Sequence, residues 1–357
     1  MSVQTVCGPI TQDSLGITLS HEHILIDRPF RSSEPEEASK KSMMNMRVRD
    51  LGIENLGMIR LDPMFVKDNL NLDEIDVALN ELKEYRTMGG NSLVDVTLQG
   101  AGRNPAILKE ISEKVGLNIV CGTGWYVKST HPPMVKKCSV NQLCDIMVKE
   151  LTEGIDNTGI KAGIIGELGC SQPAPFHPEE RKVIKAAVLA QKKTGVCITI
   201  HPSLFDLKIS RIIKTGHDCL DLLERQGFNP ARFYLSHAGW VCQDLDYLIK
   251  LLDRGVTLSF DSFGSNADSQ LNTLSVRYRK PCDAERIIAI VELCKMGYDK
   301  QIVVSQDICM KIHLKKYGGY GYSHILENVV PILRREGVSK KQVQKILVEN
   351  PRNLLTH

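Results

Sequence analysis

One pattern recurs along the chain and limits what it can fold into. A short apolar run rich in β-branched residues is followed by a turn and then by an amphipathic helical pattern. Eight such runs occur, at residues 16–23, 91–97, 117–124, 162–169, 196–202, 232–239, 256–264 and 301–307. Apolar strands that alternate with helices are typical of a parallel sheet covered by helices. Eight of them in one chain predict an α/β fold, the (β/α)8 TIM barrel.

The segments between the runs support this prediction. Residues 72–89, 178–195 and 244–255 carry apolar residues at helical spacing, and each segment ends in a glycine, a usual helix stop. An open doubly wound sheet is the alternative, but it would need a glycine-rich phosphate loop after its first strand, and the sequence has none there. Residues 1–15 predict a short β-hairpin, and the long first connection, residues 28–70, is expected to lie over the barrel mouth.

Length and composition exclude several classes of protein. The 357 residues suit a single barrel domain over residues 1–357, and 42% of them are hydrophobic. The formal charge of +3 is nearly balanced and forms no basic stripe, so we expect no nucleic-acid partner. No signal peptide, membrane-spanning stretch or Cys-x-x-Cys pair is found, although there are eleven cysteines. We therefore expect a cytoplasmic protein with no membrane partner.

Potential metal ligands stand at the C-terminal ends of five of the predicted strands. In a barrel these ends meet at one rim, where such enzymes carry out their chemistry. Four histidines and two carboxylates at one mouth suit a pair of divalent metal ions, for which we expect Zn²⁺, with Mn²⁺, Co²⁺ or Fe²⁺ as alternatives. The six residues are His21, His23, Glu167, His201, His237 and Asp307.

Each of these residues has a simpler explanation when it is taken alone. A single histidine at a strand end is more often a hydrogen-bonded rim residue than a ligand. Glu167 could pair with an arginine, and Asp307 could cap the following helix. The metal interpretation is favoured by the set, because ten histidines scattered at random would rarely place four at equivalent strand ends.

Motifs spread over nearly the whole chain make it resemble the phosphotriesterase family of the amidohydrolase superfamily, and most closely its phosphotriesterase-related branch. They are SHEHI (20–24), GTGWYV (122–127), KAGIIGELGCS (161–171), IHP (200–202), LSHAG (235–239), SQDI (305–308) and KYGGYGYSHILENVVP (316–331), followed by ENPRNLL. The resemblance implies a metal-dependent hydrolase that acts on a small molecule. Barrels of this family often pair through helices and loops near the mouth, so a homodimer is an open alternative.

The resemblance also implies a ligand set for two metal ions. One ion would be held by His21, His23 and Asp307, and the other by His201 and His237. A bridging carboxylate and a bridging hydroxide would link the two ions.

Glu167 is the candidate for the bridging carboxylate. In phosphotriesterases and lactonases the bridge is a carboxylated lysine, whereas the phosphotriesterase-related branch carries a glutamate there. The matching strand of this chain has Glu167 at its C-terminal end, and Lys161 stands at the other end.

The chemistry that such a site implies is hydrolysis. A hydroxide shared by two cations is a nucleophile near neutral pH, and a cation can polarise the C=O or P=O bond of a substrate. Asp307 is the expected catalytic residue, accepting the proton of the hydroxide and passing it on. We expect a carboxylic ester, lactone or amide as substrate. The alternatives are a phosphotriester or phosphodiester at the same site, or a metal-bearing protein that only binds a ligand.

Several residues near the rim are candidates for contact with the substrate. Trp125 and Tyr126 follow the third strand, and family lactonases have a tyrosine that matches Tyr126; packing at the rim is the alternative for both. Ser262 stands where lactonases of acyl-homoserine lactones carry an arginine, which argues against that activity. Lys311 and Lys315 could receive an anionic group, although solvated lysines are more common.

Overall fold

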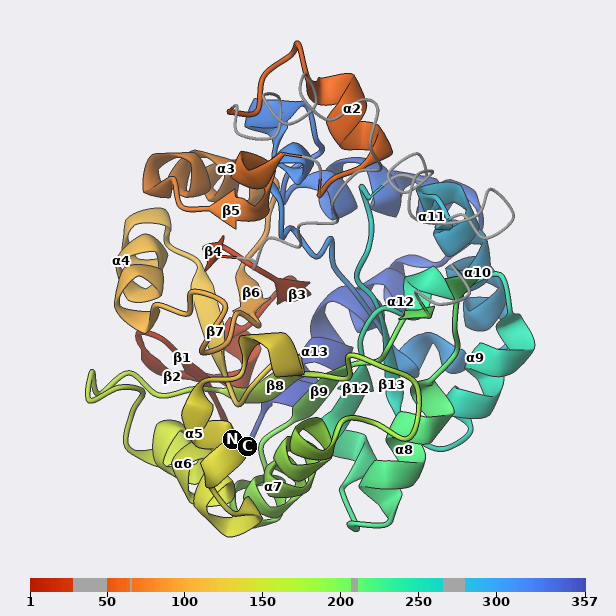
Figure 1. Cartoon of the computed structure of the whole chain (residues 1–357). Helices are drawn as coiled ribbons and strands as arrows, with labels where there is room; N and C mark the ends of the chain where they lie inside the picture. Colours follow the sequence, from red (N-terminus) through yellow and green to blue (C-terminus); the bar gives the residue numbers. More distant parts are fainter. Residues whose placement is uncertain (28–49, 65, 207–210, 266–279) are drawn as a thin grey trace, which may run out of the picture.

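A computed structural model of the chain has the expected barrel at its centre (Figure 1). The structure describes residues 1–27, 50–64, 66–206, 211–265 and 280–357. Each of the eight apolar runs contains one barrel strand. The strands are β3 (Thr18–Glu22), β6 (Ser92–Asp95), β7 (Asn118–Thr123), β8 (Ile164–Gly169), β9 (Ile198–His201), β12 (Phe233–Leu235), β13 (Thr257–Phe260) and β14 (Ile302–Val304).

These strands form one parallel sheet in the order β14-β13-β12-β9-β8-β7-β6-β3. Its two edge strands lie next to each other. The Ser20 hydroxyl donates to the Val304 carbonyl at 3.3 Å, and the His21 amide donates to Ser305 Oγ at 3.0 Å. The sheet therefore curls into a nearly closed barrel, which brings the first and the last strand of the chain side by side. The TIM-barrel prediction is confirmed.

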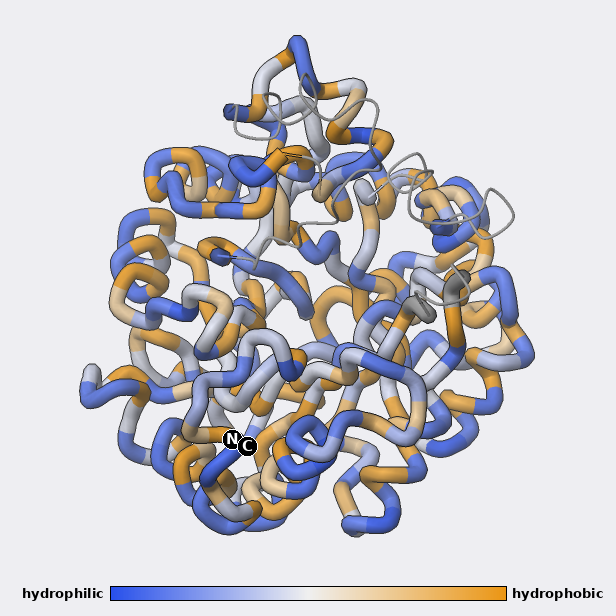
Figure 2. The backbone as a smooth tube through the Cα atoms, in the orientation of Figure 1, coloured by the Kyte–Doolittle hydropathy of each residue, from blue (hydrophilic) through white to orange (hydrophobic). Residues whose placement is uncertain are grey.

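Helices form the outer layer around the sheet (Figure 1). The three helical patterns named from the sequence correspond to α3 (Ile75–Thr87), α7 (Pro178–Thr194) and α9 (Leu245–Leu252). Figure 2 shows hydrophobic and hydrophilic residues alternating along the outer helices, as expected for helices with one buried face. The other α-helices of the described residues are α2 (Leu56–Leu61), α4 (Pro105–Val115), α5 (Pro133–Lys137), α6 (Val140–Thr152), α8 (Gly216–Glu224), α10 (Asp283–Lys295), α11 (Val330–Arg335), α12 (Lys340–Gln344) and α13 (Asn350–Leu355).

The predicted N-terminal hairpin is confirmed as β1 (Ser2–Thr5) and β2 (Gly8–Thr11), which pair antiparallel. The Val6 amide donates to the carbonyl of Ile119, near the start of β7, so the hairpin lies at the base of the barrel. Ser2 and His357 exchange two backbone hydrogen bonds of 3.3 and 3.0 Å, which places both chain ends there.

Apolar side chains fill the barrel interior from this base. Val94, Val120, Ile164 and Val303, each from a different strand, pack in one buried cluster that also contains Leu354. The larger cluster lies between the sheet and the outer helices. The interior side chains close the lower part of the barrel. The polar groups of the interior therefore lie at the C-terminal ends of the strands.

The long first connection, residues 28–70, lies partly outside the described residues, namely at 28–49 and 65. Two short antiparallel pairs accompany the barrel: β4 (Ile26–Asp27) with β5 (Asn71–Leu72), and β10 (Phe205–Asp206) with β11 (Arg211–Ile212). The described end of the first connection packs on the loop that follows β14, since the Ile312 amide donates to Asn69 Oδ1 at 2.8 Å. This part lies on the mouth side, as expected.

Within the described ranges, no helix is both long enough and apolar enough to cross a membrane.

Candidate metal centre

The structure brings together all six residues that the sequence singled out. His21 and Glu167 lie within β3 and β8, and His201 ends β9. His23, His237 and Asp307 follow β3, β12 and β14, respectively, within three residues. All six therefore stand at the carboxyl ends of the strands, at the mouth of the barrel.

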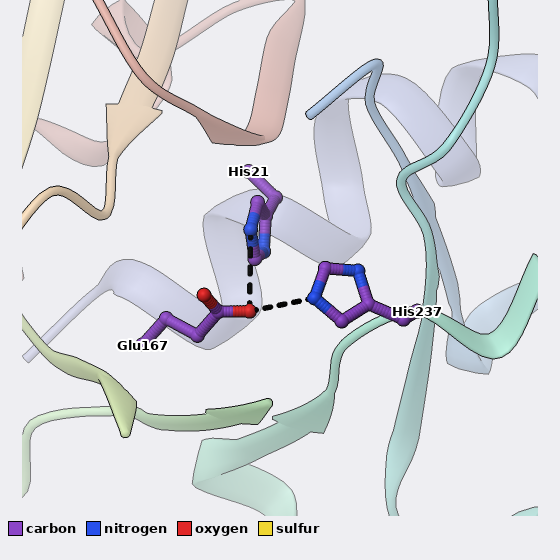
Figure 3. A group of neighbouring side chains, drawn as sticks. All are labelled: His21, Glu167 and His237. Carbon is purple, nitrogen blue, oxygen red and sulfur yellow. Dashed lines mark ion pairs between the residues drawn. The ribbon is translucent and has the colours of Figure 1, made fainter. Parts of the chain in front are cut away.

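The Glu167 carboxylate lies at the centre of three imidazoles. Its Oε1 is 2.8 Å from His237 Nε2, 3.2 Å from His201 Nδ1 and 3.4 Å from His21 Nε2. Figure 3 shows how the carboxylate and the rings of His21 and His237 point toward one another. This is the arrangement expected of a carboxylate that links two groups of metal ligands.

Asp307 closes the other side of the cluster. Its Oδ1 lies 3.3 Å from His23 Nε2 and 3.7 Å from His21 Nε2. Two groups of side chains therefore have ligand atoms close enough together to share an ion, His21 with Glu167 and His237, and His21 with His23 and Asp307.

The rings of His21 and His23 each contact a hydroxyl group through Nδ1, which suits metal ligation through Nε2. His23 Nδ1 lies 2.8 Å from Thr97 Oγ1, and His21 Nδ1 lies 3.1 Å from Ser236 Oγ. A ligating histidine usually binds a polar group through one nitrogen and directs the other at the metal. The inward Nε2 atom of His21 is buried and has no hydrogen-bond partner among the described residues. A buried ring nitrogen of this kind, beside two carboxylates, suits a metal ligand, so the residues present fit divalent metal ions.

Both inner carboxyl groups are ionised. Burial alone would raise the pKa of Glu167, but the imidazoles of His21, His201 and His237 hold it well below its usual range. Burial opposes ionisation of Asp307 too, but the hydrogen bond from His23 and the charges of His21 and His237 lower the pKa of that carboxyl. A buried carboxylate, Glu167, and a partly exposed one, Asp307, lie close together and need positive charge nearby, which divalent cations would supply.

Sequence reasoning missed one buried carboxylate, Asp261. It follows β13 and accepts hydrogen bonds from the His237 amide at 3.0 Å and from His237 Nδ1 at 2.8 Å. Burial would raise the pKa of Asp261, but His237 and His21 lower it, so the group is an anion. The signal was present in the sequence, because Asp261 is a carboxylate at a strand end like Asp307, immediately before Ser262.

We expect Asp261→Asn to weaken zinc binding by about 10–100-fold, because partners of this kind fix the tautomer and orientation of a ligating histidine. Zinc affinity would be measured by titration against a competing chelator. The matched control is Asp253→Asn, which changes an exposed carboxylate hydrogen-bonded by Tyr298 at 2.7 Å. Unchanged zinc affinity in Asp261→Asn would show that Asp261 serves only to pack the strand end.

The three predicted substrate contacts lie near the rim in different settings. The Tyr126 hydroxyl is 3.2 Å from His201 Nδ1 and therefore reaches the metal centre. Trp125 is buried and its indole donates to Gln99 Oε1 at 3.0 Å, so it is part of the rim packing. Ser262 is also buried, with its hydroxyl 3.4 Å from Asp261 Oδ1. A substrate contact stays a prediction for all three.

Lys311 and Lys315 already have anionic partners within the protein. Lys311 Nζ lies 2.6 Å from Asp68 Oδ1, and Lys315 Nζ lies 2.8 Å from carboxylates of Glu84 and Glu327. Lys311 is buried and not solvated. Neither side chain offers an unbalanced charge to a substrate.

Comparison with known proteins agrees with this site. Residues 1–355 match the model of the phosphotriesterase family. A phosphotriesterase-related protein of Nematostella vectensis is 35% identical, covering 99% of this chain and 98% of that protein. An N-acetyltaurine hydrolase of Xenopus tropicalis is 36% identical, covering 99% of this chain and 97% of that enzyme.

Among solved structures, a resiniferatoxin-binding protein from Rhodobacter sphaeroides superposes with a TM-score of 0.90 at 33% identity, covering 99% of this chain and 94% of that one. The sequence resemblance stated above is thereby confirmed. The chain belongs to the phosphotriesterase family and is a hydrolase of that family.

Proposed function

We propose that this protein is a binuclear metal-dependent amidase that cleaves the N-acyl bond of a small anionic amide such as N-acetyltaurine. The observation that carries the proposal is the Glu167 carboxylate between three imidazoles, with Asp307 beside them. The side chains of Asp307 and His201 are 22% and 21% exposed, whereas those of Glu167 and His21 are 4% and 0% exposed. A substrate would therefore approach over Asp307 and His201.

The choice of an amide within the wider class of esters, lactones and amides rests on the relatives. Enzymes named N-acetyltaurine hydrolase from several vertebrates match 99% of this chain at up to 36% identity. N-acetyltaurine is an acetamide whose amine part ends in a sulfonate. Hydrolysis of such an amide requires an activated water, a polarised carbonyl group and a proton for the departing amine.

The site can supply each of these requirements. Two divalent cations, with zinc as the first choice, would make water nucleophilic and polarise the carbonyl oxygen. Asp307 is ionised and partly exposed, so its carboxylate can accept the proton of the attacking water and pass it to the leaving nitrogen. The Tyr126 hydroxyl lies beside His201 at the open side and would donate a hydrogen bond to a substrate oxygen.

The test is a substrate comparison on zinc-loaded protein. We expect N-acetyltaurine to be cleaved to acetate and taurine with a kcat/KM at least about 10-fold above those of a γ-lactone, a phenyl ester and a phosphotriester, because discrimination of this size needs only one well-placed contact. A higher kcat/KM for the lactone or the phosphotriester than for N-acetyltaurine would show that the site is a lactonase or a phosphotriesterase, respectively. Binding without turnover of any substrate would favour a metal-bearing binding protein.

A further inference from the structure

Lys280 places a buried ammonium group near the metal centre. The residue is only 6% exposed. Its Nζ donates to the Ser265 hydroxyl and lies 4.0 Å from the centroid of the Trp240 ring. Trp240 follows the ligand candidate His237 by three residues, and Ser265 comes after β13. Both contacts of Lys280 therefore belong to loops at the mouth of the barrel.

No carboxylate within the described part of the chain pairs with this ammonium group. A buried lysine is costly unless an anion accompanies it. Among the described residues its three N–H groups have one hydroxyl and one aromatic face as partners, so a further acceptor could be bound. Lys311 is the useful contrast, because that buried lysine lies 2.6 Å from Asp68 and 3.3 Å from Glu74.

A second buried cation, Arg286, lies beside Lys280. Its Nη2 contacts the carbonyl oxygen of Ser265 at 3.4 Å, and its Nη1 lies 2.8 Å from Asp283 Oδ1. The same Asp283 carboxylate also receives His324 Nε2 at 2.8 Å. Arg286 Nε is buried without a hydrogen-bond partner in the described ranges. Arg286 thus pairs with a carboxylate that His324 also contacts, whereas Lys280 pairs with no carboxylate in the described ranges, so Asp283 alone does not balance the positive charge of this corner of the mouth.

The electrostatics of Lys280 link it to the metal centre. Burial first, and then the charge of Arg286, lower the pKa of Lys280 to about 7, while Asp307 and Asp261 act in the opposite direction. The ammonium is therefore within electrostatic reach of two carboxylates of the metal centre. An anion that approached Lys280 would favour its charged form, as any close negative charge does.

We propose that Lys280, with Arg286 behind it, receives the anionic tail of the substrate, a sulfonate or a carboxylate, while the amide lies at the metal centre. The proposal rests on the function proposed above and adds the residue that selects for charge. Lys280 would contact a part of the substrate that does not react. Its contribution is therefore binding energy shared by the ground state and the transition state, which appears in KM more than in kcat.

Three acetamides with tails of matching length test this inference on zinc-loaded protein. They are N-acetyltaurine with a sulfonate, N-acetyl-β-alanine with a carboxylate, and N-propylacetamide with no charge. In Lys280→Met, which keeps an apolar stem against Trp240, we expect KM to rise about 10–100-fold for the two anionic amides, the usual value of a charged hydrogen bond. The kinetics of N-propylacetamide should stay unchanged, and Lys280→Arg should recover most of the affinity. The ratio of the kcat/KM values for the two anionic substrates tells whether the site at Lys280 prefers a sulfonate or a carboxylate.

The control is Lys214→Met, which removes a lysine that lies 5.6 Å from the Tyr247 ring centroid and pairs with Asp244. Equal effects of Lys280→Met on charged and neutral amides, or no effect on either, would overturn the proposal. Calorimetric binding of ethanesulfonate, which cannot be cleaved, makes the outcome independent of turnover. Ethanesulfonate bound by the natural protein but not by Lys280→Met, without hydrolysis of any amide, would refute the amidase and keep the anion site. Hydrolysis of the amides with equal binding of ethanesulfonate by both proteins would support the amidase and refute the anion site.

Discussion

Asp307→Asn is expected to lower kcat about 10²–10⁴-fold, the usual contribution of a positioned general base. Asparagine has nearly the shape of aspartate but cannot accept a proton from water. Position 307 has a left-handed backbone with φ of 54°, which asparagine tolerates better than most residues, so the loop geometry should survive. The measurement is the steady-state rate at saturating zinc, with the metal content of the same sample determined by mass spectrometry.

The matched control for this variant is Asp156→Asn. Asp156 also has a left-handed backbone, with φ of 46°, but its side chain is 60% exposed, lies beside Arg103 and belongs to neither group of metal-ligand candidates. We expect its activity to equal that of the natural protein. Full activity of Asp307→Asn with zinc bound would show that another group accepts the proton. Loss of both zinc and activity in Asp307→Asn would show that Asp307 acts as a metal ligand and would not support a role as general base.

Glu167→Ala should have the largest effect on metal content. Removal of the carboxylate that three imidazoles share is expected to reduce zinc from about two ions per chain to about one or fewer, with loss of the hydrolysis that requires both. The carboxylate also offsets the repulsion between neighbouring cations, so both sites should weaken together. Zinc per chain after dialysis, measured beside activity, tests this expectation.

Glu180→Gln controls for the cost of altering any buried glutamate. Glu180 is fully buried and accepts hydrogen bonds from the amides of Lys128 at 2.8 Å and Ser171 at 3.0 Å, outside the metal centre. It should keep its zinc even if its melting temperature falls. A Glu167→Ala protein that retained about two ions per chain would contradict the bridging role.

Most of the fold could be predicted from local sequence because the barrel strands are almost wholly buried, and most of them are short runs of apolar and β-branched residues. The run that contains β8 and the helical pattern of α7 are both evident without knowledge of their neighbours. The metal-ligand set was equally accessible, since strand ends in a barrel meet at one rim. His21 and Asp307 come from opposite ends of the chain, yet both positions follow directly from this rule.

Groups that depend on partners distant in the sequence could not be predicted in the same way. Lys311 and its partner Asp68 are 243 residues apart, so nothing local reveals that this charge is balanced. Lys280 presents the opposite case, because a lysine a few residues before a helix usually suggests a solvated charge. Only the packing of Trp240 and Arg286 around it shows that the ammonium is buried.

The pairing of Ser2 with His357 at the base of the barrel bears on how the protein can be handled and redesigned. An affinity tag or a surface tether at either end would leave the mouth facing the solution, so immobilised enzyme should remain accessible to substrate. A short linker could also join the two ends, because neighbouring termini favour circular permutation. New ends could then be opened in an outer connection, where the change would alter the order of folding without touching the groups at the rim.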